Sequence, residues 1–429
     1  MNSAGEPNEP DRARRYLLRA AGEPGIRDLR DYQAQQGARA GVASRRADSR
    51  VPASLHATGY FLPNDWILWH SEGLLEAIKL STGDHVRVEG TPGNDASLSK
   101  LPASVWDSLA RFEPLLGQLR EQLQKEALQP LTRETVLRGS GWKHLFVELT
   151  AKCNEQCVHC YAESSPARKE ALAWPELSKV LKDAKALDFD LVQLTGGDPL
   201  ISPHCVQAVQ FAKEIGIPQV EIYTNGLALR GRIYDRLREL APSFAFSFYS
   251  HNAETHDAIT QTPGSHARTA RAIRRTVDDG LDVRVGVVSM GKNQRDASKT
   301  HEYLLGLGVP DGSIAFDQMR DVGRGDATLL ETSTRLAGVH TGGVESTRPR
   351  NFGGSAAVSY DGQVYPCIFS RHLPLGSIYD ASLEAILTSA EPIAPQGKNL
   401  LQARERWGEK LSCWECQTRS ALLDGSCNA

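Results

Sequence analysis

The sequence lacks three features that would assign the protein to a membrane, to secretion or to nucleic acid. No apolar run is long enough to cross a bilayer. The N-terminal region is polar and arginine-rich from Asp11 to Arg50, and it has no apolar core like that of a secretory signal. The net charge is −3, so no global basic field indicates nucleic-acid binding. We therefore expect a cytoplasmic protein with neither a membrane nor a nucleic acid as partner.

Cysteine is scarce, and its copies are unevenly placed. The chain has eight cysteines in 429 residues. In a cytosolic chain of this size, clustered cysteines are more often metal ligands than disulfides. Cys205 stands alone in a helical stretch and is expected to be a small buried hydrophobe. The other cysteines form two groups, and we expect each group to bind metal. They are Cys153, Cys157 and Cys160, and then Cys367, Cys413, Cys416 and Cys427.

The length of the chain predicts two or three domains, because a single core rarely grows to 429 residues. Residues 1–54 show little apolar periodicity, so we expect a flexible Arg-rich segment with a short helix at Tyr16–Ala21. Residues 55–140 have the pattern of a small α+β domain, with a strand at His85–Glu89 and a helix over Val105–Leu128.

A regular alternation of strands and helices begins near residue 144. It predicts six βα units with short connections, which are typical of a parallel sheet with helices outside it. Six strands fall short of the eight of a closed barrel, so we predict an α/β fold with a partial (β/α)6 TIM-like barrel over residues 141–330. Its active site should lie at the C-terminal ends of the strands. The predicted strands are His144–Leu149, Leu191–Thr195, Val220–Thr224, Phe244–Tyr249, Val283–Ser289 and Ile314–Met319.

The first cysteine group directly follows the first of these strands and reads Cys153-Asn-Glu-Gln-Cys157-Val-His-Cys160. Three thiolates on one short loop can bind three irons of a cubane cluster, which normally has four thiolates. No fourth cysteine lies nearby, so one iron would stay open to another ligand, and an open metal position is where chemistry can happen. The alternative is a structural zinc site with His159 as the fourth ligand, although a neighbour of Cys160 has awkward geometry for that role.

The spacing C-x3-C-x2-C at the end of a first strand resembles the radical S-adenosylmethionine (SAM) superfamily. The resemblance implies that the open iron of a [4Fe–4S] cluster binds SAM. An electron from the cluster then splits SAM into methionine and a 5′-deoxyadenosyl radical, which abstracts hydrogen from the substrate. It also implies an electron donor such as flavodoxin or ferredoxin. Cys153, Cys157 and Cys160 are thus the catalytic and metal-binding residues that the resemblance implies.

Other positions resemble the SAM-binding motifs of the same superfamily. The second strand ends in Gly196-Gly197-Asp198-Pro199, which resembles the GGEP motif with Asp where Glu is commoner. Ser247 resembles a fourth-strand residue that contacts SAM. Alternatively, its hydroxyl is simply hydrogen-bonded within the strand. His159 stands where relatives place a ring near the adenine, and its alternative is a partly solvated loop histidine. The implied SAM-binding set is His159, Gly196, Gly197, Asp198, Pro199, Thr224, Asn225 and Ser247.

The second cysteine group lies in residues 345–429, where the βα alternation ends. Cys367, the pair Cys413-Trp-Glu-Cys416 and Cys427 suit a tetrahedral zinc or a fully ligated [4Fe–4S] cluster equally well. The run Tyr360-Asp-Gly-Gln-Val-Tyr-Pro-Cys367, within a predicted hairpin, resembles the start of the SPASM and Twitch extensions of radical SAM enzymes. These extensions carry auxiliary clusters. Because the full SPASM pattern has seven cysteines and this group has four, the resemblance favours one auxiliary [4Fe–4S] cluster, as in Twitch domains.

Two further stretches, Ser247–Gly264 and Asp317–Gly325, resemble peptide-modifying SPASM proteins. These include maturases of ribosomally synthesised, post-translationally modified peptides (RiPPs). Such relatives often have a small N-terminal domain that binds the leader peptide as an added strand. Residues 55–140 have the right size for this, and the alternative is a domain that caps the fold without a partner. The resemblance thus implies an oxidoreductase that matures a precursor peptide.

Two other functions stay open. One is a radical SAM dehydrogenase of small-molecule biosynthesis, acting on an amino sugar or an antibiotic. The other, from a different class, is a non-catalytic zinc-binding interaction protein. Asp317, Arg320 and Tyr249 lie at strand ends or just past them and can face the cavity, but each can equally be structural.

Overall fold

The computed structural model describes residues 131–139, 141–325, 353–390 and 422–423, together with the six strands of an N-terminal sheet. The chain divides into two compact units, each with its own sheet. The first unit contains residues 1–135, 390–404 and 421–425, and the second contains residues 136–389, 405–420 and 426–429.

The sheet of the first unit has the strand order β2-β1-β6-β5-β4-β3. Strands β3 to β6 form an antiparallel meander, and β1 joins it in parallel beside β6. The strand at His85–Glu89 is confirmed as β6, while the helix predicted over Val105–Leu128 lies outside the described residues. The strands are β1 Arg15–Arg19, β2 Arg27–Asp28, β3 Gly59–Leu62, β4 Trp66–Ser71, β5 Leu74–Lys79 and β6 His85–Glu89.

The short helix predicted at Tyr16–Ala21 is wrong, because this stretch lies in and beside β1. Residues Arg15–Arg19 pair one by one with His85–Glu89, and β1 also pairs with β2. A helix of this length has little stability alone because its first turn is costly to form. An open sheet edge instead offers each backbone group a partner. The segment expected to be flexible therefore contributes two strands to this sheet.

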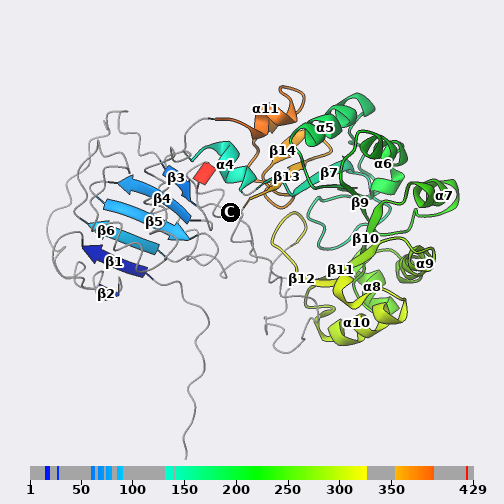
Figure 1. The fold of residues 1–429 in the computed structure, drawn as a ribbon. Coiled ribbons are helices and arrows are strands. Elements are labelled where there is room, and N and C mark those ends of the chain that lie inside the picture. Colours follow the sequence, from blue (N-terminus) through cyan, green and yellow to red (C-terminus); the bar gives the residue numbers. More distant parts are fainter. Residues whose placement is uncertain are drawn as a thin grey trace, which may run out of the picture. The chain divides into compact units, whose positions relative to one another are not determined.

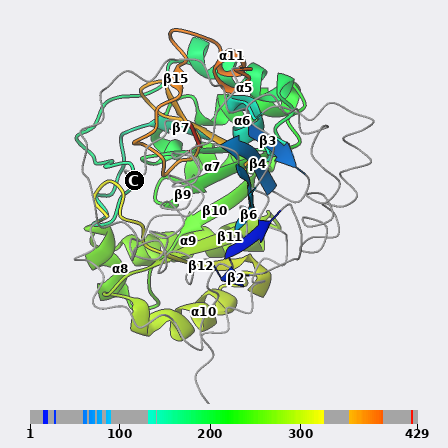
Figure 2. The same ribbon diagram turned by 90° about the vertical axis from the view of Figure 1, so that its left-hand side faces the viewer.

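The second unit is built on a curved sheet with the order β12-β11-β10-β9-β8-β7-β13-β14-β15. The six strands predicted from the sequence are confirmed as β7 to β12 and run parallel, in chain order across the sheet (Figure 2). A sheet of this kind is buried on both faces, which explains why all of β8 after its first residue is buried. The strands are β7 His144–Thr150, β8 Leu191–Gly196, β9 Gln219–Thr224, β10 Ser243–Ser247, β11 Val283–Ser289 and β12 Ile314–Gln318.

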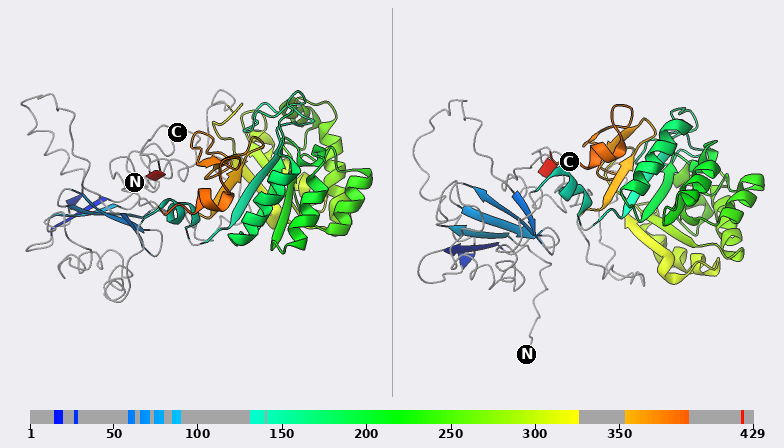
Figure 3. Two further views of the ribbon diagram at one scale, coloured as in Figure 1. Left: turned by 90° about the horizontal axis from the view of Figure 1, so that it is seen from above. Right: turned by 45° about the horizontal axis from the view of Figure 1, so that its top comes forward.

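The hairpin predicted near Cys367 is confirmed, and it extends the same sheet. Strand β13 (Ser355–Val358) pairs in parallel with β7, and β14 (Gln363–Tyr365) and β15 (Gly376–Ser377) follow in antiparallel order. Figure 3 shows these orange strands beside the teal β7. The second cysteine region thus begins next to the strand that leads into the first.

Helices cover the outer side of this sheet (Figure 1). Helices α5 to α10 lie in the connections between neighbouring parallel strands, with α8 and α9 in the same connection. The buried apolar face of α5 is Leu177, Val180, Leu181 and Ala184. Burial of such side chains stabilises the unit by about 1.5–3 kcal/mol each. No helix in the described part of the chain combines the length and apolarity needed to cross a bilayer. The helices are α4 Arg133–Arg138, α5 Trp174–Ala186, α6 Cys205–Glu214, α7 Gly231–Leu240, α8 Ala253–Thr260, α9 Ser265–Asp278, α10 Ala297–Gly306 and α11 Leu383–Leu387.

Candidate active site

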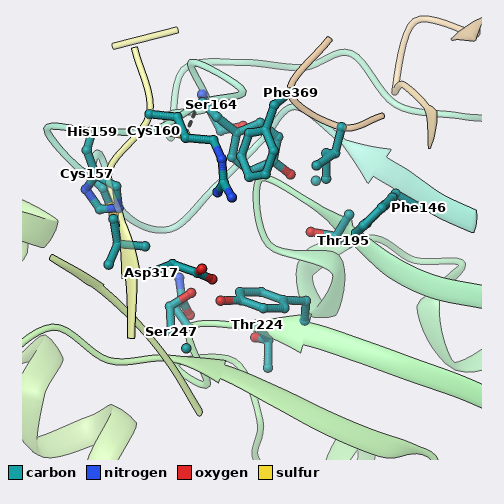
Figure 4. A pocket seen from close by; sticks show the side chains of 18 of the residues that line it. Phe146, Cys157, His159, Cys160, Ser164, Thr195, Thr224, Ser247, Asp317 and Phe369 are labelled. Carbon is teal, nitrogen blue, oxygen red and sulfur yellow. Dashed lines mark hydrogen bonds between the residues drawn. The ribbon is translucent and has the colours of Figure 1, made fainter. Parts of the chain in front are cut away.

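A cavity of about 350 Å³ lies at the carboxyl ends of the parallel strands, where the active site is expected. The strand ends contribute Gly196 and Gly197 at the end of β8, Thr224 and Asn225 at the end of β9, and Ser247 at the end of β10. Figure 4 shows Ser247 and Thr224 on one side of this space and the cysteine-bearing loop on another. The sheet therefore gathers five of the predicted SAM-binding residues around one cavity.

All three cysteines of the first group line this cavity. They lie on a segment that we call the cluster loop, residues 153–164, which begins just after β7. The sulfur of Cys153 accepts hydrogen bonds from the backbone N–H of Glu155 (3.4 Å) and from the side-chain amide of Asn225 (3.8 Å). The sulfur of Cys160 accepts one from the backbone N–H of Ser164 (3.4 Å). Hydrogen bonds to cysteine sulfurs are typical of iron–sulfur sites, where they adjust the reduction potential.

The thiols of Cys153 and Cys157 are protonated when no metal is bound. Burial raises the pKa of Cys153, and the nearby charge of Asp198 raises it further. Burial also raises the pKa of Cys157 well above its ordinary range. A metal centre displaces these protons because it binds the thiolate. Among the described residues, no group of three or more His, Cys, Asp or Glu is arranged to hold a single metal ion. Three cysteines of one loop, all lining one cavity, fit the three thiolate-bound irons of a cubane cluster.

The turn after β8 approaches the cluster loop so closely that it requires glycine. The backbone N–H of Gly197 donates to the carbonyl of Thr150 (2.7 Å), and a Cβ at Gly197 would lie 1.9 Å from the carbonyl oxygen of Lys152. Any side chain would push the two backbones apart. The Gly-Gly pair thus sets the distance between the SAM-motif turn and the cysteines.

Asp198 and Pro199 lie just behind this turn and are not among the cavity-lining residues. The fully buried carboxylate of Asp198 accepts hydrogen bonds from the Thr224 hydroxyl (2.6 Å) and from the backbone N–H groups of Asn225 (3.1 Å) and Leu200 (3.0 Å). Asp198 therefore ties the end of β8 to the end of β9. In this structure its carboxylate is used to position the SAM-motif residues around it.

His159 and Tyr249 form part of the cavity wall. Their rings meet edge to face with centroids 4.9 Å apart. Burial lowers the pKa of His159 to about 4, and the charge of Arg324 contributes, so the ring is neutral at pH 7. Its Nδ1 is buried without a hydrogen-bond partner among the described residues. Tyr249, Asp317 and Arg320 were expected either to face the cavity or to be structural, and all three line the cavity.

Polar strand residues that the sequence reasoning missed lie deeper in the barrel. The Arg284 guanidinium donates to both carboxylate oxygens of buried Glu221 (2.6 and 2.7 Å), which also accepts from Gln193. Burial would raise the pKa of Glu221, but the hydrogen bonds from Arg284 hold it below its ordinary value. His144 stacks on Phe146 with ring centroids 3.8 Å apart. The sequence could have indicated these residues, because charged side chains are unusual inside parallel strands, which are otherwise apolar.

Glu155, within the cluster loop, joins a second buried network. Its carboxyl accepts from the Ser265 hydroxyl, which in turn contacts the Nε2 of His256 (3.3 Å). The Nδ1 of His256 accepts the backbone N–H of Tyr249 (3.3 Å). Burial raises the pKa of Glu155 to about 7. The network links the cluster loop to helices α8 and α9.

The second cysteine region reaches the same cavity through Ile368 and Phe369. Phe369 meets Tyr161 edge to face at 5.4 Å, and Cys367 packs in the same apolar group. Buried Glu148 on β7 accepts hydrogen bonds from Arg371 and from the Ser359 hydroxyl (2.8 Å). Cys413, Cys416 and Cys427 lie outside the described residues.

Two family models match the chain. The radical SAM superfamily model matches residues 147–304, and a model described as an iron–sulfur cluster-binding domain, SPASM, matches residues 351–417. The three cysteines of the cluster loop and the Gly-Gly turn lie within the first match, whereas Asp317 and Arg320 of the cavity wall lie between the two matches. The chain therefore contains a radical SAM domain followed by a SPASM domain.

Relatives among curated proteins are 28–29% identical to the chain over the aligned residues. The subtilosin biosynthesis protein AlbA of Bacillus subtilis is 28% identical over 273 residues, covering 57% of this chain and 59% of AlbA. The AdoMet-dependent heme synthase of Methanosarcina barkeri is 29% identical over 42% of this chain and 51% of that protein. The alignments thus span about half to three-fifths of these relatives. The two matched regions are a radical SAM domain and a SPASM iron–sulfur cluster-binding domain, and the chain is similar to AlbA.

Solved structures with a similar chain trace include SuiB of Streptococcus suis bound to S-adenosylmethionine. Its TM-score is 0.47 at 12% identity, over 77% of this chain and 88% of SuiB. Another is anSMEcpe with bound AdoMet, with a TM-score of 0.45 at 15% identity, over 58% of this chain and 80% of that one.

Proposed function

We propose that this enzyme matures a ribosomally synthesised peptide by abstracting a hydrogen atom from one of its side chains. The observation that carries the proposal is the shared cavity, which is lined both by the three cysteines of the cluster loop and by Ile368 and Phe369 of the second cysteine region. A radical formed at the first site would therefore face residues of the second. The relationship to AlbA, a bacteriocin biosynthesis protein, supports a peptide substrate.

We assign Cys153, Cys157 and Cys160 as ligands of the radical SAM cluster. When bound there, the cluster and SAM supply the 5′-deoxyadenosyl radical. The backbone of Gly196 and Gly197 and the polar groups of Thr224, Asn225, Ser247 and His159 are the proposed SAM contacts, while Asp198 and Pro199 shape the turn beneath them. The substrate side chain would then meet Asp317 and Arg284, charged groups on the remaining cavity wall.

We assign the four later cysteines, Cys367, Cys413, Cys416 and Cys427, to one auxiliary [4Fe–4S] cluster. If all four bind, no iron is free for substrate, and the cluster would accept or relay the electron that the substrate radical loses. This role fits the position of Cys367, which packs with Tyr161 and Phe369 beside the cavity.

The N-terminal sheet is the proposed binding site for the leader of the precursor peptide. Its strand β3 (Gly59–Leu62) pairs with β4 and, among the described strands, with no other. An extended leader can add to such an edge through main-chain hydrogen bonds. The full-length enzyme should therefore bind a precursor peptide much more tightly than the same peptide without its leader. Equal affinities would contradict the assignment.

The central test uses anaerobically reconstituted enzyme with SAM, a reductant and the peptide encoded by a short open reading frame beside the gene. We expect about eight irons per chain, 5′-deoxyadenosine, and a peptide that has lost hydrogen by mass spectrometry. Cys157→Ala should abolish 5′-deoxyadenosine formation, whereas Cys205→Ala, a buried cysteine of helix α6, should retain it. Zinc without iron would favour the interaction protein, and oxidation of a small molecule but no peptide would favour the dehydrogenase.

A further inference from the structure

The segment after β12 folds back onto the cluster loop. We call Met319–Gly325 the strap. Within it, Arg324 makes three hydrogen bonds to carbonyl oxygens of the cluster loop. Its backbone N–H donates to Cys160 (3.0 Å), its Nε to Cys157 (3.0 Å) and its Nη2 to Ser164 (2.8 Å). Two of these three carbonyls belong to proposed cluster ligands. One side chain thus spans the loop from its second cysteine to its end.

The strap has the backbone that this contact needs. Gly323 has φ +63°, and a Cβ there would lie 2.4 Å from the carbonyl oxygen of Tyr161 and 2.6 Å from that of Cys160. A side chain would lift the strap off the loop. The strap is also turned tightly on itself, since the backbone N–H groups of Val322 and Gly325 donate to Arg320 (2.9 Å) and Val322 (3.1 Å). Arg324 is therefore presented to the loop on a stiff, close-fitting turn.

The contact also brings a permanent positive charge to the cluster loop. Arg324 is half-buried, and its guanidinium acts on the ring of His159 in the same loop. An iron–sulfur cluster becomes more negative when it is reduced. A fixed cation in a partly desolvated site stabilises the reduced form relative to the oxidised one. The same side chain thus combines a mechanical role with an electrostatic one.

We propose that Arg324 is a positioning residue for the radical SAM cluster: its hydrogen bonds hold Cys157 and Cys160 in place, and its charge favours the reduced state. The inference rests on the proposed function only in that the cluster loop binds the catalytic cluster. It assigns a role to the stretch Asp317–Gly325, which the sequence singled out without explaining.

The test compares full-length, reconstituted enzyme with its Arg324→Gln and Arg324→Lys variants. The matched control is Arg268→Gln, because Arg268 also donates to two carbonyls, of Gly264 (3.1 Å) and Pro263 (3.3 Å), but on the exposed start of helix α9. Two readouts need no turnover. One is the reduction potential of the cluster whose electron paramagnetic resonance signal changes when SAM is added. The other is the rate at which the enzyme loses iron to a chelator.

Arg324→Gln should move the potential to a more negative value and speed iron loss about tenfold, as expected when hydrogen bonds from a charged group are lost. Arg324→Lys keeps the charge but not the planar fork, so its potential should stay near that of the wild type while iron loss still rises. Arg268→Gln should change neither. A wild-type potential and iron retention in Arg324→Gln would overturn the proposal. The proposal would also be overturned if Arg324→Lys shifted the reduction potential as far as Arg324→Gln does.

Failure of the proposed function would look different. If Cys157→Ala kept the SAM-responsive signal, the cluster assignment itself would be wrong, whatever Arg324 does. If peptide turnover is absent while the signal and its Arg324 dependence are present, the substrate proposal fails and the positioning role stands.

Discussion

The two cysteine-bearing regions of this chain differ in how their proposed metal ligands are brought together. Cys153, Cys157 and Cys160 lie within one loop, and the structure surrounds them with fixed donors from β9, the strap and the loop itself. In the second region, Cys367 follows a hairpin, and its partners in sequence stand far downstream. A site whose ligands are neighbours in sequence can be predicted from spacing, whereas a site whose ligands are dispersed depends on the folding of the chain between them.

The largest expected contrast is between Cys157→Ala and Cys367→Ala. The first should abolish 5′-deoxyadenosine formation. The second should retain it but yield no modified peptide, because the electron left on the substrate has no acceptor. Liquid chromatography of 5′-deoxyadenosine beside mass spectrometry of the peptide checks both. Loss of SAM cleavage in Cys367→Ala would erase the distinction between the two regions.

The next effect concerns the ion pair that joins the regions. Arg371, three-quarters buried or more, binds the buried carboxylate of Glu148 on β7. Arg371→Met would leave that charge unpaired, so the free energy of unfolding should fall by about 3–5 kcal/mol. The double variant Glu148→Gln with Arg371→Met should recover much of the loss. Urea denaturation measures both, and a single variant as stable as the wild type would show that the pair does not hold the regions together.

Acid should weaken the first region through His256. Burial, and then the charge of His266, lowers the pKa of His256 to about 3, below about 6.5 in the unfolded chain. The folded state therefore binds fewer protons at His256, whereas it binds more at Glu155, whose pKa is raised, so the contribution of His256 is the difference between wild type and variant. The free energy of unfolding is unaffected by the titration of His256 above pH 6.5. As the pH is lowered from 6.5 to 3, it falls by about 1.4 kcal/mol per pH unit, because only the unfolded chain takes up the proton. Denaturation between pH 7.5 and 5 should show a shallower pH dependence in His256→Gln. An unchanged slope would exclude His256 as the source.

The smallest effect is expected at the surface contact between the regions. Arg168 follows the cluster loop and donates to the Tyr360 hydroxyl (3.1 Å) while pairing with Glu170. Exposed ion pairs contribute little because water and salt screen them. Arg168→Gln should leave the urea midpoint and SAM cleavage unchanged within error. A clear loss would mean that this contact, and not Arg371, joins the two regions.

Much of the fold could be predicted because its signals are local. Strands β7 to β11 are short, largely buried runs that are each followed by a helix, and these patterns depend on adjacent residues. Six of six strands in the barrel were found this way. The failure at Arg15–Arg19 has the opposite cause, since that strand exists only because β6 offers it an edge some 70 residues later in the chain.

The sequence by itself determined the cysteine spacing of the cluster loop, the Gly-Gly turn and the alternation that puts both at one edge of a sheet. Only the tertiary structure decided how the rest of the chain serves that loop. It brings Arg324 onto the carbonyls of Cys157 and Ser164, Asp198 under Thr224 and Asn225, and Arg371 against Glu148. The physical reason is that each contact joins residues far apart in the chain, and no periodicity or spacing between neighbours records which distant side chain will arrive.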